Sequence, residues 1–182
     1  MNRTKILKTV TIALFAALTA VGAFIKIPIP PVPITLQTLF TLISGLLLPL
    51  SVSVSSILVY LFLGIIGLPI FTSGGGIAAV TGPTGGYLIG LLPAVIVAGI
   101  MLKKDKKYPF WYFLLASFLA NVAIYIPGLF WLGYSRHLTI AKTLSAGLVP
   151  FIVGDVLKMI VSATVSYKLR GQVVKLLEEN EE

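Results

Sequence analysis

The 182-residue sequence contains no cysteine and only one histidine. Without cysteine the chain has no disulfide, no thiolate metal site and no cysteine nucleophile. The histidine, His137, follows Arg136 and has neither a second histidine nor a carboxylate close by in the sequence, so we predict no metal site there. The sequence also contains no ATP-binding motif, so any ATP-driven activity requires partner proteins.

Charged residues are scarce as well. They make up 11% of the chain, whereas 57% of the residues are hydrophobic and the mean hydropathy is +1.02. Soluble domains contain about half apolar and about a quarter charged residues. The composition therefore predicts an integral membrane protein, and the length suits one domain, residues 1–182, without a separate soluble domain.

Basic residues outnumber acidic residues by 14 to 6. They flank apolar runs and do not form a stripe with interleaved aromatic residues, so we expect no nucleic-acid partner. Ten of them lie in three segments, which are residues 3–8, the KKDKK loop at 103–107, and residues 168–175. The positive-inside rule places all three segments on the cytoplasmic side if an even number of spans separates them.

Six apolar runs divide the chain, and we interpret each as one membrane span. The first run could be mistaken for a secretory signal peptide, but no polar cleavage region follows it and five further runs do. We therefore predict an all-α bundle of six transmembrane helices with both termini in the cytoplasm. The predicted spans are residues 7–25, 35–50, 52–66, 87–102, 110–134 and 144–169.

Two connections on the predicted outer side are unusual. Residues 26–33 contain four prolines, which exclude a regular helix and predict a stiff external connection. Residues 67–86 contain seven glycines and no charge. Irregular backbone is tolerated at membrane depth only where it is buried in protein or lines a cavity, so we interpret this segment as an external lid. A flexible linker is the alternative, but linkers of that kind are usually polar.

The last apolar run contains a carboxylate and an ammonium group, Asp155 and Lys158. An isolated charge at the bilayer centre costs about 3 to over 10 kcal/mol, so such residues are rare and usually face a bundle interior or a cavity. On a helix the two residues are neighbours on one face, together with Phe151 and Ser162. The pair indicates either a binding site or a self-neutralising contact that only fixes helix packing.

Two further patterns leave alternatives open. Asn121, four residues before Tyr125 in an apolar run, needs a hydrogen-bond partner, which is either another helix or a ligand. The first run places alanines at spacings of three and four residues, which gives a smooth helix face. Such a face allows close packing, either inside the protein or with a partner subunit. These alanines are Ala13, Ala16, Ala17, Ala20 and Ala23.

Five segments resemble those of a known family in their order and spacing. They are TLQTL at 35–39, GLPIF at 67–71, GPTGGYLIG at 82–90, NVAIYIPGLFWLG at 121–133 and GDVLK at 154–158. Together they closely resemble the BioY family, the biotin-binding S components of energy-coupling-factor vitamin transporters. The resemblance covers nearly the whole chain, from the first predicted span to the sixth.

This resemblance implies a six-helix subunit of the bacterial plasma membrane that captures biotin from outside and delivers it inward, and that is not an enzyme. In the family an alanine-rich face of the first helix docks onto a transmembrane coupling protein attached to two cytoplasmic ATPases. The corresponding residues are Ala13, Ala17 and Ala20. Some members are thought to work without a dedicated coupling module. The ligand is biotin, and no cofactor is implied.

Biotin has a ureido ring with two N–H donors and one carbonyl acceptor, an apolar thiophane ring and a carboxylate tail. Asp155 can accept from the ureido N–H groups, and Lys158 can donate to the ureido oxygen or hold the carboxylate. Further predicted polar contacts are Tyr87, Asn121 and Gln37, the predicted apolar walls are Phe71, Tyr125 and Phe151, and the glycines predicted to let the lid backbone approach the ligand are Gly82, Gly85 and Gly86.

Three rival functions remain. The first is an S component for another small vitamin. The second is an intramembrane enzyme, but such enzymes usually require several carboxylates or a histidine or cysteine nucleophile, and Asp155 is the only acid within any apolar run. The third is a purely structural membrane subunit, against which the charge pair and the glycine-rich segment both argue.

Overall fold

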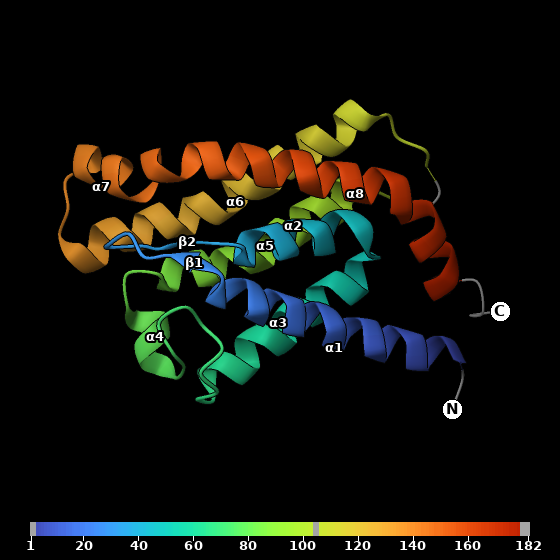
Figure 1. The fold of residues 1–182 in the computed structure, drawn as a ribbon, viewed down its shortest axis with the longest axis horizontal. Helices are drawn as coiled ribbons and strands as arrows, with labels where there is room; N and C mark the ends of the chain where they lie inside the picture. The colour runs from blue at the N-terminus through green and yellow to red at the C-terminus, as the bar shows by residue number, and fades with distance from the viewer. Residues whose placement is uncertain (1–2, 104–105, 179–182) are drawn as a thin grey trace.

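Helices make up nearly all of the computed structural model, which describes residues 3–103 and 106–178. The long helices lie side by side along the longest axis of the molecule (Figure 1). The elements are α1 (Arg3–Phe24), β1 (Lys26–Ile27), β2 (Ile34–Thr35), α2 (Gln37–Leu47), α3 (Leu50–Ile65), α4 (Ile77–Thr81), α5 (Gly85–Met101), α6 (Phe110–Arg136), α7 (Ile140–Gly147), a 3-10 turn (Val149–Phe151) and α8 (Ile152–Glu178).

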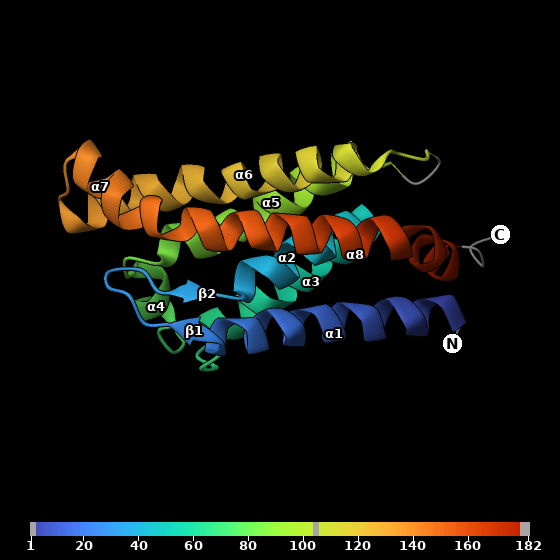
Figure 2. The same ribbon diagram turned by 45° about the horizontal axis from the view of Figure 1, so that its top comes forward.

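The chain termini and the short elements lie at opposite ends of the bundle. Helix α1 begins, and helix α8 ends, at the same end of the molecule (Figure 2). The connection between α5 and α6 lies at that end too, although Lys104 and Asp105 of its KKDKK loop fall outside the described residues. The β1–β2 hairpin, α4 and α7 lie towards the opposite end (Figure 1).

Three helical segments are long and apolar enough to cross a membrane, and three shorter helices are also apolar. The long ones are Arg3–Phe24, Phe110–Arg136 and Ile140–Leu177, and the shorter ones are Gln37–Leu47, Leu50–Ile65 and Gly85–Met101. Each of the six apolar runs of the sequence therefore corresponds to helix, with boundaries that differ by a few residues.

The last run, residues 144–169, is not one continuous helix, and in this respect the prediction was wrong. Helix α7 ends at Gly147, and Leu148 has φ −126° and ψ −55°, outside regular helix geometry. Pro150 follows inside the 3-10 turn, where its missing N–H and its ring interrupt an α-helix. Helix α8 therefore starts at Ile152, which places Asp155 in its first turn. A carboxylate is favoured there by the helix dipole.

Glycines allow α5 and α6 to approach closely. A Cβ atom added at Gly90 would lie 2.7 Å from the Ile124 carbonyl oxygen and 2.9 Å from the Ile124 Cα. One helical turn earlier, a Cβ on Gly86 would collide with the Pro127 carbonyl oxygen. Two glycines four residues apart at a helix contact are a common device for close packing in membranes. The contact matters for function because both helices line the cavity described below.

The proline-rich connection at 26–33 contains a short antiparallel hairpin rather than only an irregular linker. Lys26 pairs with Thr35 and Ile27 pairs with Ile34. All four prolines lie in the segment between the strands, where no ladder hydrogen bond is needed from them. The hairpin is joined to the glycine-rich segment by a hydrogen bond of 2.9 Å from Lys26 Nζ to the Thr72 carbonyl oxygen.

Candidate ligand-binding site

Asp155 and Lys158 form a buried ion pair near the start of α8. The distance from Lys158 Nζ to Asp155 Oδ1 is 3.0 Å, and each residue is only 6% exposed. Their i, i+3 spacing brings the two side chains together on one helix face. Burying both charges is expensive unless further hydrogen bonds satisfy the remaining lone pairs and protons.

Helix α6 supplies two of those hydrogen bonds to Asp155. Asn121 Nδ2 donates to Asp155 Oδ2 at 3.2 Å, and the Tyr125 hydroxyl donates to the same oxygen. Asn121 and Tyr125 are one turn apart on α6, so one face of that helix presents both donors. The structure shows the helix-to-helix contact of Asn121, which also lines the cavity described below, so its ligand contact stays a prediction. Tyr125, predicted only as an apolar wall, is also a polar partner of the charge pair.

Helix α2 supplies a partner to Lys158. The ammonium group donates to Thr38 Oγ1 at 3.1 Å, in addition to its bond with Asp155. Two of the three N–H donors of Lys158 are thus used by described residues, and the third has no described partner. Three elements, α2, α6 and α8, therefore converge on the pair.

The pair borders a cavity whose empty volume, including its open mouth, is about 600 Å³. Pockets for small ligands usually have mostly apolar walls with a few polar groups. This cavity fits that description. It is lined by Val32, Pro33, Thr35, Gln37, Thr38, Thr72, Thr84, Tyr87, Leu88, Leu91, Asn121, Ile124, Tyr125, Phe151, Asp155 and Lys158.

The structure brings most of the predicted site residues together. Gln37, Tyr87 and Phe151 line the cavity along with the residues of the pair. Gln37 is buried, and among the described residues its side-chain amide has no hydrogen-bond partner. The hydroxyl of Tyr87 donates to the Gly147 carbonyl oxygen at 2.8 Å, which ties α5 to the end of α7.

Phe71, predicted as an apolar wall, and the three predicted lid glycines are not among the residues that line the cavity. Phe71 does not line the cavity: it is 1% exposed, packs edge-on against Tyr60 with 5.3 Å between ring centroids, and fills the space left by Gly64. Gly85 does not line it either; its missing side chain makes room for the Val80 carbonyl oxygen, and its contact with a ligand stays a prediction. The same holds for Gly82, whose carbonyl oxygen accepts from Trp131 Nε1, and for Gly86, which packs on α6.

Sequence reasoning missed the threonines and the proline-rich wall. Thr35 ends β2, Thr38 lies in the first turn of α2, and Thr72 and Thr84 come from the glycine-rich segment. Val32, from the segment treated as a plain external connection, is 5% exposed and packs with Leu132 and Phe151. The TLQT segment at the entry of an apolar run was the available signal for the first two threonines.

The predicted docking residues lie on α1, away from the cavity. Ala13 and Ala17 are exposed and Ala20 is half-buried, whereas Ala16 and Ala23 are buried in the protein. The alanine face is therefore divided, with one edge packed inside and the other edge open.

Comparisons with known proteins agree with this architecture. The model of the BioY family matches residues 1–175. The chain is 42% identical over 171 residues to a probable biotin transporter BioY of Lysinibacillus sphaericus, covering 90% of this chain and 86% of that protein. It is 39% identical over 159 residues to the biotin transporter BioY of Thermotoga maritima, covering 86% and 92% of the two chains.

A solved structure is similar as well. The crystal structure of the S component for biotin from an ECF-type ABC transporter matches with a TM-score of 0.84 and 30% identity, over 93% of this chain and 94% of that chain. The described helices include three apolar segments long enough to span a membrane. The chain is a multi-pass protein of the plasma membrane and a transport component rather than an enzyme, and it belongs to the BioY family.

Proposed function

We propose that this chain binds biotin with high affinity on the outer side of the membrane and delivers it to the cytoplasm, using energy from partner ATPases. The observation that supports this most directly is the buried Asp155–Lys158 pair at the wall of a mostly apolar cavity. Ionisable groups inside a membrane bundle mark substrate sites by default.

The free hydrogen-bonding positions of the pair complement a cyclic urea. A carboxylate offers about four acceptor positions, and described donors occupy three of those on Asp155. One acceptor position on Asp155 and one N–H of Lys158 are therefore left for a ligand. A ureido group presents an N–H donor next to a carbonyl acceptor, which is the matching arrangement. The apolar wall formed by Leu88, Leu91 and Phe151 suits a thiophane ring.

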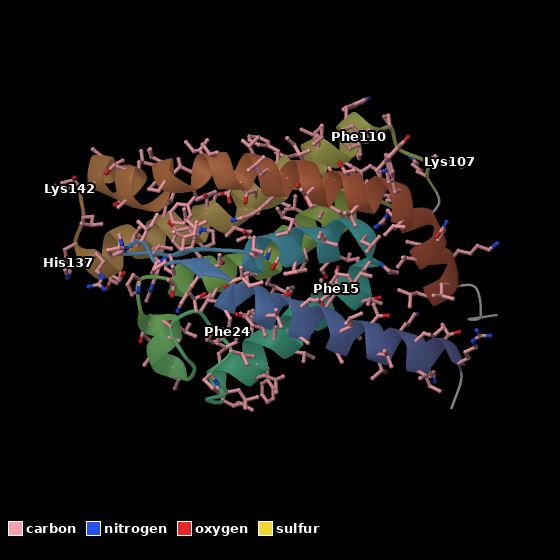
Figure 3. The ribbon with its side chains drawn as sticks, in the orientation of Figure 1. Phe15, Phe24, Lys107, Phe110, His137 and Lys142 are labelled. Atoms are coloured by element: carbon pink, nitrogen blue, oxygen red, sulfur yellow. The ribbon has the colours of Figure 1, made fainter. Side chains whose placement is uncertain are left out.

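The distribution of basic residues between the two ends of the molecule supports a six-span topology and a cavity on the outer side of the membrane. Lys107 lies at one end of the molecule, and His137 and Lys142 lie at the opposite end (Figure 3). Most of the basic residues belong to the first of these ends, which the positive-inside rule assigns to the cytoplasm together with both chain termini. The cavity-lining hairpin and the glycine-rich segment are then on the outer side.

We further propose that the hairpin and the glycine-rich segment together form the lid of the cavity. Val32 and Pro33 come from the first segment, and Thr72 and Thr84 from the second. The Lys26–Thr72 hydrogen bond joins the two segments. Gly74 and Gly76, with φ values of 109° and 82°, give the second segment a backbone path that other residues rarely adopt.

For the energy source, the exposed edge of α1 is the proposed contact with a transmembrane coupling protein that is attached to two cytoplasmic ATPases. Replacing both Ala13 and Ala17 by leucine adds bulk where close helix approach is needed. We expect biotin binding to stay within about twofold of the wild type while uptake by cells falls at least about tenfold. Val161→Leu, on an exposed position of α8, is the control, and normal uptake by the alanine variant would contradict this docking face.

Retention of labelled biotin by the purified protein is the direct test of the function. We expect nanomolar affinity by calorimetry in detergent, because the cavity is preformed and its charged groups are already oriented. A panel of other small vitamins should bind at least about a hundredfold more weakly. Tight binding of another vitamin, with weak binding of biotin, would reassign the chain to that ligand.

A further inference from the structure

Arg170 is a buried charged residue that the ligand site does not explain. It lies on α8 and is 8% exposed. Its Nη1 donates to the carbonyl oxygens of Leu46 at 2.8 Å and Leu48 at 3.2 Å, and its Nη2 donates to the carbonyl oxygen of Leu102. Burying a guanidinium group is costly unless it is hydrogen-bonded, and these three contacts contribute to that compensation.

The three carbonyl groups are the open C-terminal ends of two helices. Helix α2 ends at Leu47 and helix α5 at Met101, and the last four carbonyl groups of any helix lack a partner within the helix. Here Leu46, Leu48 and Leu102 are at most 1% exposed, so solvent water does not satisfy them. Arg170 supplies the missing donors and places a positive charge where helix dipoles favour one.

The other end of α2 forms part of the ligand cavity. Gln37 and Thr38 line the cavity, and Thr38 accepts the hydrogen bond from Lys158. Two cationic side chains of α8 therefore contact the two ends of α2. Lys158 contacts its N-terminal end, and Arg170 contacts its C-terminal end. At about 1.5 Å per residue, Lys158 and Arg170 are about 18 Å apart along α8. Their partners Thr38 and Leu46 are about 12 Å apart along α2. The long side chains of lysine and arginine bridge the difference.

We propose that Arg170 is a positioning residue for the ligand cavity. By holding the C-terminal ends of α2 and α5 against α8, it sets the register in which Thr38 meets Lys158. Helix α2 has only 11 residues, so a small slide along α8 would separate Thr38 from the ammonium group. The inference rests on the proposed function only for the identity of the ligand.

A double-mutant cycle between the two ends of α2 tests the inference. Arg170→Gln removes the charge at the far end, and Thr38→Val removes the hydrogen bond at the cavity. We expect Arg170→Gln to weaken biotin binding about tenfold or more, and to add little further loss once Thr38 is already valine. General destabilisation would weaken binding by the same factor in both backgrounds, so the two losses would multiply and overturn the proposal.

Controls keep this result interpretable. Lys168→Gln changes an exposed residue of the same helix and should leave affinity unchanged. If Arg170→Gln does not fold, Arg170→Lys replaces it in the cycle, because an ammonium group keeps the charge but cannot fork between several carbonyl groups. If the wild type binds no biotin, the proposed function fails, and the same cycle is measured by thermal unfolding. Non-additive shifts in melting temperature then support the coupling, and additive shifts overturn it.

Discussion

Asp155→Ala is expected to abolish high-affinity biotin binding while the protein remains folded. The substitution removes the acceptor of Lys158, Asn121 and Tyr125 at once. Removing one partner of a buried ion pair costs about 3–5 kcal/mol, because the remaining charge is left uncompensated. It also removes the position proposed for the ureido N–H. The folding cost lowers stability, whereas the lost acceptor position and the changed setting of Lys158 weaken binding, by at least about a hundredfold in calorimetry in detergent.

The matched control is Ser162→Ala, on the same face of α8. Ser162 is fully buried and pairs with Ser117 at 3.0 Å, but it does not line the cavity. Its loss should lower stability by about 1 kcal/mol and leave biotin affinity unchanged. Gel filtration and thermal unfolding establish that both variants fold. A wild-type affinity for Asp155→Ala would remove Asp155 from the proposed site.

Gly90→Val is expected to lower the folding stability of the protein substantially. The first added atom alone would lie 2.7 Å from the Ile124 carbonyl oxygen, and that oxygen belongs to a helix backbone that cannot rotate away. Overpacking of this kind costs about 1–3 kcal/mol and sometimes more. For a chain of this size each kcal/mol lowers the melting temperature by about 2–4 °C. We expect a drop of roughly 10 °C or failure to accumulate in the membrane.

Gly171→Ala is the control for Gly90→Val, because it adds a side chain at a glycine that has open space around it. Gly171 lies within α8, and a Cβ added there meets nothing within 4 Å. Alanine is favoured over glycine in a helix by about 1 kcal/mol, so this variant should melt slightly higher than the wild type. If Gly90→Val and Gly171→Ala shift the melting temperature equally, close packing of α5 on α6 is not what requires Gly90.

The contacts of charged and polar residues within the apolar runs could be predicted from the sequence. Asp155 and Lys158 stand out because charge is rare in apolar runs, and their i, i+3 spacing alone implies contact. Asn121 needed a partner for the same reason, and the structure supplies Asp155. The apolar runs identified the helices because hydrophobicity over a span length is a strong signal.

Residues whose role depends on the path of an irregular segment could not be predicted. Phe71 and Thr72 are adjacent in the glycine-rich segment, yet the first enters the core and the second lines the cavity. No periodicity distinguishes them, because glycines with positive φ redirect the chain nearby. The break between α7 and α8 was missed because Pro150 lies within an otherwise apolar run, where hydropathy continues without change.

The i, i+3 spacing of Asp155 and Lys158 also bears on how α8 enters the membrane during synthesis. A helix that must cross into lipid alone pays for every uncompensated charge that it contains. Because both charges are within one turn of the same helix, α8 can neutralise itself before any other helix is beside it. Asn121, Tyr125 and Thr38 then join an ion pair that already exists. We therefore expect the insertion of α8 to depend less on the order in which the bundle assembles.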